Sequence, residues 1–271
     1  HRHLFNKTWA AQWAQGIEFN YDWFAPHECY GKAAGNLTEL HDLRAAFQKL
    51  GYPDIVCKAP FGTAANGNRC ILNTDTVNDS LNQWLESIWA TQGKVLLEPW
   101  LPRVFDFSVQ FERRKQGTKI VAYTRLLNNA RGQFKGILTN GFTKGLDPQT
   151  KRFLMERIEG RPRVYHFYET VLLPMLDTRL AGMDYQGPLG IDAFIYRDNE
   201  GKLTLKPIVE INPRYTMGRI AYELEKHNAP QSIGQFAIIT KSQLKASKHT
   251  SFAAYCQDLQ ANHPIQLTVE K

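Results

Sequence analysis

The 271 residues carry a net charge of +7, and 43% of them are hydrophobic, which is enough for a substantial core in one large domain or two modest ones. No apolar run reaches membrane-spanning length, and the four cysteines lack the Cys-x-x-Cys spacing of a zinc site. The net positive charge permits nucleic-acid binding, but the basic residues are scattered, which argues against it. A polyanionic small ligand would explain local positive charge equally well. We therefore expect a cytoplasmic protein without a nucleic-acid or membrane partner.

The first half of the chain alternates short helices with short buried strands. Leu40, Leu43, Phe47 and Leu50 recur at helical spacing over 36–50, and Gly51 follows where a left-handed residue ends a helix. The same spacing predicts a helix over 76–91. The remaining expectations are a helix over 7–15, Thr38 as the cap of the 36–50 helix, and strands over 54–59, 70–72 and 94–101.

A glycine-containing loop joins the first two of these strands. Lys58 lies on the strand before it, and Gly62 and Gly67 bracket four small residues. These are Thr63, Ala64, Ala65 and Asn66. The loop is not a P-loop, because Asn68 and Arg69 stand where Lys and Ser or Thr are required. It either folds over phosphates as a flap with Lys58 beneath it as a point charge, or it is a hairpin loop with an incidental lysine.

The strand over 94–101 ends in an extended segment, Glu98-Pro99-Trp100-Leu101. Pro99 keeps Glu98 out of helical geometry. An extended segment leaves backbone groups unpaired at its edge, and a flat base can use them. This role is compatible with a simpler one, in which Trp100 and Leu101 only link two domains.

From Val104 onward the sequence changes to long alternating strands, which predict an antiparallel sheet with one buried face. The expected strands cover 105–112, 119–127 and 133–139, and a hairpin covers 187–219 around a turn at 197–202. Helices are expected over 162–180, 218–226, 232–244 and 253–259, and a short strand over 265–269.

The hairpin places acidic and amide side chains on one face. Side chains alternate along a strand, so Glu210 and Asn212 share a face, and Asp192 is expected opposite Glu210. Such oxygen ligands suit a hard divalent ion such as Mg²⁺, which usually completes its shell with water and phosphate. Arg214, two positions after Asn212, suits a phosphate or a developing oxyanion. The alternative is an ordinary solvated face of a hairpin.

These motifs, taken in order, resemble the ATP-grasp superfamily over roughly residues 36 to 245. The resemblance rests on four motifs. They are Lys58 on the strand before the glycine loop, Glu98 at the hinge with the apolar residues that follow it, Asp192 on the first acidic strand, and Glu210-Ile-Asn212-Pro-Arg214. The last is close to the Glu-x-Asn-x-Arg signature of the superfamily's carboxylase and ligase members. The flap lacks the multiple glycines of many members.

The resemblance implies an α+β ATP-grasp fold, with two α+β subdomains that clamp ATP and a larger subdomain built on an antiparallel sheet. The small subdomain would cover 36–102 and the large one, with the metal site, 103–271. Residues 1–35 would then be a linker or a remnant of a preceding Rossmann-like domain. That preceding domain often lines the substrate pocket of family members.

The resemblance also implies roles for single residues. Lys58 would contact the phosphates under the flap, and Glu98, with the backbone of Pro99, Trp100 and Leu101, would hold adenine. One or two Mg²⁺ ions, with Mn²⁺ as the alternative, would bind Asp192, Glu210 and Asn212. Arg214 would be the catalytic cation at the transferring phosphate or tetrahedral centre.

The implied function is an ATP- and Mg²⁺-dependent ligase that activates a carboxylate as an acyl phosphate for attack by an amine. A carboxylase or small-molecule kinase would use the same ATP residues, and a nucleotide-binding regulatory module would bind without turnover. A basic nucleic-acid-binding protein is the alternative of another class. The expected partners are a small carboxylate and an amine, and a homo-oligomer is left open.

Overall fold

The computed structural model describes residues 2–18, 21–62, 67–129, 132, 134–227 and 234–237. Within it the chain forms two compact units, each assembled from separate stretches. Unit 1 comprises residues 1–106, 180–185 and 191–213, and unit 2 comprises 107–179, 186–190 and 214–271. The predicted subdomains 36–102 and 103–271 follow from the family resemblance, whereas these units are defined by compactness. The subdomain boundaries therefore stay a prediction.

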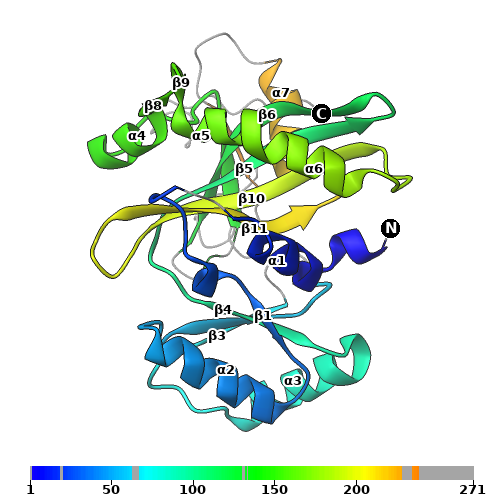
Figure 1. The fold of residues 1–271 in the computed structure, drawn as a ribbon, viewed down its shortest axis with the longest axis vertical. Helices are drawn as coiled ribbons and strands as arrows, with labels where there is room; N and C mark the ends of the chain where they lie inside the picture. The colour runs from blue at the N-terminus through cyan, green and yellow to red at the C-terminus, as the bar shows by residue number, and fades with distance from the viewer. Residues whose placement is uncertain are drawn as a thin grey trace, which may run out of the picture. The chain divides into compact units, whose positions relative to one another are not determined.

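Unit 1 contains a four-stranded sheet in the order β1-β4-β2-β3. Antiparallel pairing places Lys58 of β2 opposite Leu96 of β4, and Val56 opposite Glu98. Helices α2 and α3 pack on one face of this sheet, where Leu40, Phe47 and Leu85 are fully buried (Figure 1). The elements are η1 (Arg2–Phe5), α1 (Lys7–Gln15), η2 (His27–Cys29), β1 (Lys32–Ala34), α2 (Leu37–Lys49), β2 (Ile55–Lys58), β3 (Asn68–Ile71), α3 (Asp79–Gln92) and β4 (Val95–Pro99).

Unit 1 also holds most of the hairpin formed by β10 (Gly187–Arg197) and β11 (Leu203–Asn212). Its turn uses Gly201 at φ 79°, and the Asp198 carboxylate accepts backbone hydrogen bonds from Glu200 and Lys202. Helix α1 contacts both β11 and β1 (Figure 1). The N-terminal helix therefore touches the hairpin as well as the four-stranded sheet.

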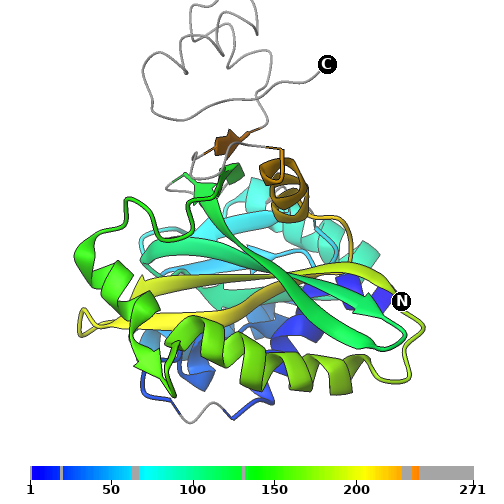
Figure 2. The same ribbon diagram turned by 90° about the horizontal axis from the view of Figure 1, so that it is seen from above.

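A larger sheet has the strand order β11-β10-β5-β6-β7-β12. Within unit 2, the helical run from α5 to α6 lies along β5 and β6 (Figure 2), and Phe107, Tyr123, Tyr165 and Tyr168 form an aromatic cluster there. The elements are β5 (Arg103–Arg114), β6 (Gly117–Asn128), β7 (Phe134–Thr139), α4 (Pro148–Met155), β8 (Arg157–Ile158), β9 (Arg161–Pro162), α5 (Arg163–His166), the π-helical η3 (Phe167–Leu172), α6 (Leu173–Leu180), α7 (Met217–Glu225) and β12 (Gly234–Phe236).

A group of neutral polar side chains is buried in unit 2. Gln110 donates to the Ser108 hydroxyl over 2.8 Å and accepts from the Thr216 hydroxyl over 2.6 Å, and it lies 3.4 Å from Thr124. Thr216 also caps α7, because its oxygen accepts the backbone N–H of Arg219. We call Ser108, Gln110, Thr124 and Thr216 the neutral cluster.

The expected mixture of helices and antiparallel strands is confirmed, and two local predictions are wrong. Asn36, not Thr38, caps α2, since its side chain accepts the backbone N–H of Glu39. The helix expected over 232–244 is contradicted at Gly234–Phe236, which forms β12 against β7. The rest of that helix, the helix over 253–259 and the strand over 265–269 lie outside the described residues. None of the described helices is long and apolar enough to cross a membrane.

Candidate functional site

The neck of the glycine loop is closed by its two glycines. Gly62 and Gly67 lie so close that a Cβ on either would be 3.0 Å from the Cα of the other. Backbone bonds from Ala59 to Gly67 and from Gly62 to Ala59 fasten the two loop ends together. Side chains at both positions would push the loop ends apart, which explains the spacing of these glycines. Thr63, Ala64, Ala65 and Asn66, the predicted tip of the flap, lie outside the described residues.

Lys7, at the first turn of α1, connects this neck with the hairpin. Its ammonium group donates to the carbonyl oxygen of Gly62 and lies 3.1 Å from Oε1 of Glu210. Its backbone N–H donates to the carbonyl of Pro60 over 2.9 Å, and the side chain is 4% exposed. One buried cation thus touches both the predicted flap and a predicted metal ligand. Among the described residues, the buried hydroxyl of the adjacent Thr8 has no hydrogen-bond partner.

A second group of charges is buried at the hinge. Oε2 of Glu98 accepts from the ammonium groups of Lys58 and Lys206, each over 2.8 Å. Lys206 donates also to the carbonyl oxygen of Cys29 over 2.8 Å. The exposed fractions are 3% for Lys58, 3% for Glu98 and 1% for Lys206. We call Lys58, Glu98 and Lys206 the hinge cluster; it has two positive charges and one negative charge.

The pKa values of Glu98 and Lys206 in the hinge cluster are shifted from their ordinary values. Burial alone would raise the pKa of Glu98, but the positive charges of Lys206 and Lys58, and hydrogen bonds from both, lower it to about 2. Burial lowers the pKa of Lys206, and the negative charge of Glu98 opposes that shift. Glu98 is therefore ionised at neutral pH and acts as the shared partner of both lysines.

The N-terminal segment shapes the surroundings of this cluster. A Cβ on Gly31 would lie 2.7 Å from Leu96 and 2.8 Å from Cγ of Glu98, so the chain passes Glu98 only because residue 31 has no side chain. The ammonium of Lys206 lies 5.6 Å from the ring of Tyr30 and 5.9 Å from that of Phe194. Aromatic rings and the Cys29 carbonyl thus hold Lys206 in place.

A hydrogen bond joins two of the three predicted metal ligands. The Asn212 amide donates to Oδ2 of Asp192 over 3.1 Å, whereas Glu210 pairs with Lys7. Asp192 and Glu210 are partly exposed and Asn212 is buried. The described residues contain no group of three or more His, Cys, Asp or Glu side chains that could hold a metal. An ion here would be held by two carboxylates with the Asn212 amide oxygen, a donor set that fits Mg²⁺.

Arg214 is exposed and belongs to unit 2, at the start of the short segment that leads into α7. Its guanidinium lies 3.5 Å from the carbonyl oxygen of Tyr215. Two residues later, Thr216 ties the segment to Gln110 of the neutral cluster. The neutral cluster therefore fixes the backbone that carries the predicted catalytic cation.

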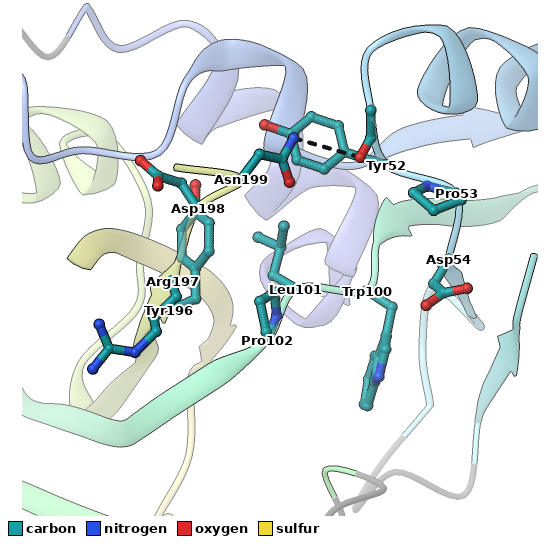
Figure 3. A pocket seen from close by; sticks show the side chains of 11 residues that line it. Tyr52, Pro53, Asp54, Trp100, Leu101, Pro102, Tyr196, Arg197, Asp198 and Asn199 are labelled. Atoms are coloured by element: carbon teal, nitrogen blue, oxygen red, sulfur yellow. Dashed lines mark hydrogen bonds between the residues drawn. The ribbon is translucent and has the colours of Figure 1, made fainter. Parts of the chain in front are cut away.

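A pocket of about 320 Å³ lies beside the hinge in unit 1 (Figure 3). Leu101 points toward Tyr52 and Asn199, whereas the Trp100 indole points the other way, as alternation along an extended segment requires (Figure 3). The backbone N–H of Trp100 is already bonded to the Asp54 carbonyl over 2.8 Å. The pocket contains no residue of the hinge cluster.

Two residues of this site were not predicted from the sequence, Lys7 and Lys206. Alternation along β11 puts Lys206 on the same face as Glu210 and Asn212, so its place was readable from the spacing. For Lys7 the available signal was weaker: Asn6 caps α1, and a lysine follows it at once. Both side chains are buried, which is rare for a lysine unless it is paired, and each has a carboxylate partner.

No protein-family model matches the sequence, and no curated protein matches it. Among solved structures, a variant of Rhizobium etli pyruvate carboxylase with the allosteric activator acetyl coenzyme A is similar, with a TM-score of 0.53 and 19% identity. That match covers 82% of this chain and 17% of the carboxylase.

Other similar structures have lower scores. The biotin carboxylase domain dimer of Hydrogenobacter thermophilus 2-oxoglutarate carboxylase, in complex with MgADP, ADP and bicarbonate, has a TM-score of 0.49 at 15% identity, over 79% of this chain and 41% of that one. Staphylococcus aureus N5-carboxyaminoimidazole synthetase with ADP has 0.48 at 15%, over 90% and 59%. The chain thus spans less than two thirds of each of these structures. Its fold is the ATP-grasp fold, as the motifs predicted.

Proposed function

We propose that this chain is the nucleotide-binding part of an ATP- and Mg²⁺-dependent ligase that activates a carboxylate for attack by an amine. The observation that carries the proposal is the position of Lys7, whose ammonium contacts both Gly62 at the flap neck and Glu210. The resemblance assigns the flap to the phosphates and Glu210 to the metal. Their meeting around one buried cation supports a common polyphosphate site.

In this proposal Lys58 and Lys7 bind the phosphates, and the hinge from Glu98 to Leu101 holds the base. Both lysines are buried cations, so they favour an anionic ligand. Asp192, Glu210 and Asn212 would hold Mg²⁺, or Mn²⁺ in its place, which when bound neutralises phosphate charge. Arg214 would stabilise charge that develops at the transferring phosphate.

The reaction needs positioning more than acid–base chemistry. A carboxylate oxygen of the acid substrate attacks the γ-phosphorus of ATP, ADP leaves, and an acyl phosphate forms. The amine then attacks the acyl carbon, and inorganic phosphate leaves with the bonding electrons and takes up the proton that the nitrogen loses. Lys58 and Lys7 would orient the phosphates for the first step, and Arg214 would face the oxyanion of the second.

A screen of small acids and amines for ADP release tests this proposal. ADP release that needs both an acid and an amine supports the ligase, and release with a single phosphate acceptor indicates a kinase. Dependence on bicarbonate indicates a carboxylase. Nucleotide binding without hydrolysis supports the regulatory module, and tight salt-sensitive binding of nucleic acid with no nucleotide binding would contradict all of these.

Three variants test the assigned roles. Lys58→Ala is expected to weaken ATP binding, and unchanged affinity would remove it from the site.

Glu210→Gln is expected to abolish Mg²⁺-dependent turnover while leaving Lys7 a neutral hydrogen-bond partner. Arg214→Ala is expected to spare ATP binding and lose the chemical step; loss of binding instead would contradict its role.

A further inference from the structure

The hinge cluster contains one lysine more than a simple ion pair needs. Lys58 and Lys206 both donate to Oε2 of Glu98, and all three side chains are buried. A buried acid with one lysine would already be neutralised. The second lysine adds a buried positive charge, which is unfavourable unless something else compensates it.

The proposed function gives Lys58 a second partner, because it assigns Lys58 to the phosphates. To reach a phosphate, Lys58 must weaken or give up its bond to Glu98. Losing one member of a buried ion pair is strongly destabilising, since the remaining charge is left without compensation. With Lys58 as its only partner, Glu98 would therefore compete with the phosphates.

Lys206 is held independently of Lys58. Its ammonium donates to the Cys29 carbonyl as well as to Glu98, and it lies near the rings of Tyr30 and Phe194. These contacts come from the segment before β1 and from β10 and do not involve Lys58. Lys206 can thus stay on Glu98 while Lys58 moves.

We propose that Lys206 is a positioning residue that keeps Glu98 paired and so frees Lys58 to bind the phosphates of the nucleotide. This inference rests on the proposed function. It assigns no contact between Lys206 and the nucleotide, and its effect depends on the phosphates rather than on the base.

The experiment compares the dissociation constants of ATP and adenosine, the latter measured by competition. In Lys206→Met, Glu98 has only Lys58, so ATP is expected to lose about tenfold in affinity relative to adenosine. Lys206→Arg keeps the charge and is expected to retain the wild-type ratio. Lys202→Met, the same change at an exposed lysine of the same hairpin, is the matched control.

A second change separates positioning from mere stability. Adding Glu98→Gln to Lys206→Met removes the acid that retains Lys58, and this double variant is expected to recover most of the lost ATP-to-adenosine ratio. A structural role for Lys206 predicts no such recovery. An unchanged ratio in Lys206→Met, or no recovery in the double variant, overturns the inference while the proposed function stands.

The wild-type protein gives a test that does not depend on the folding of Lys206→Met. Ammonium resonances of the two buried lysines can be followed by NMR, with Lys206→Arg providing the assignment. ATP is expected to shift the Lys58 resonance and leave that of Lys206 protected from exchange. Equal perturbation of both overturns the inference, and a wild-type protein that binds no ATP overturns it together with the proposed function.

Discussion

Two of the buried polar groups in the described part of the chain, the hinge cluster of unit 1 and the neutral cluster of unit 2, differ in what holds them together. The hinge cluster of unit 1 is ionic and has an excess positive charge, whereas the neutral cluster of unit 2 satisfies its groups with hydroxyl and amide hydrogen bonds. An ionic group can exchange a partner for a charged ligand, because the charge remains compensated. A neutral network has no such alternative and serves to hold α7 in one place.

Removing the shared acid of the hinge cluster is expected to have the largest effect. Glu98→Gln leaves two buried lysines without a counter-charge, and we expect the free energy of unfolding to fall by about 3 to 5 kcal/mol. Urea unfolding followed by tryptophan fluorescence measures this. Glu200→Gln, in the exposed hairpin turn, is the control and is expected to change stability little. A small effect at Glu98 would mean that the lysines lose their charge at little cost.

The second largest effect is expected in acid, where the hinge cluster should lose stability and the neutral cluster should not. Folding lowers the pKa of Glu98 from 4.5 to about 2. The contribution of this carboxylate to the free energy of unfolding is therefore fully present above pH 4.5 and is lost as the pH falls through about 2. The shift corresponds to about 3 kcal/mol of stability. We expect this part of the pH dependence to be missing in Glu98→Gln when unfolding is measured from pH 5 to 2. An identical acid profile in the two proteins would contradict the ionised, paired state of Glu98.

Within the neutral cluster, the central residue should matter most. Gln110→Leu leaves the Thr216 hydroxyl and the Ser108 hydroxyl without their amide partner, and we expect a loss of about 1 to 3 kcal/mol that does not vary between pH 5 and 8. Thermal unfolding across that range measures it. A pH-dependent loss would show that the cluster is coupled to an ionisable group.

The smallest effect is expected at the edge of the same cluster. Thr124→Val keeps the shape of the side chain and removes a hydroxyl that lies 3.4 Å from Gln110 and donates to the Ser108 carbonyl over 3.2 Å. We expect the free energy of unfolding to fall by about 0.5 to 1.5 kcal/mol, measured by the same thermal unfolding curves. A loss as large as that of Gln110→Leu would mean that the cluster acts as one cooperative network.

Much of the fold could be predicted because its signals are local. Helical spacing predicted α2 and α3, and two β-like runs around a polar turn predicted the β10–β11 hairpin with its turn near Gly201. Helix α4 was missed although Asp147 and Pro148 form a good start signal, because its apolar face is short. Strand β12 was taken for helix because its pairing with β7 depends on residues nearly a hundred positions away.

For the site, the sequence pointed to residues but not to their partners. Lys58 and Glu98 were chosen as separate contacts for phosphate and base, and the structure pairs them with each other. Asp192 was expected opposite Glu210, and the structure adds a hydrogen bond from Asn212 to Asp192 that the sequence did not indicate. The alternation along β11 placed Lys206 on the face of Glu210 and Asn212, but neither it nor the cap before Lys7 indicated burial, which depends on partners far away in the sequence.

The discontinuous make-up of unit 1 has a consequence for how the protein is made. Lys58 and Glu98 leave the ribosome before Lys206, and at 5 to 20 residues per second the interval is roughly 5 to 20 s. During that time the nascent chain can form the four-stranded sheet, but the acid in it has a single counter-charge. Closing the unit then needs a contact between segments more than a hundred residues apart, which is slow. Until Lys206 has been made, Lys58 should therefore be the only lysine partner of Glu98, which is the state that Lys206→Met reproduces in the complete protein.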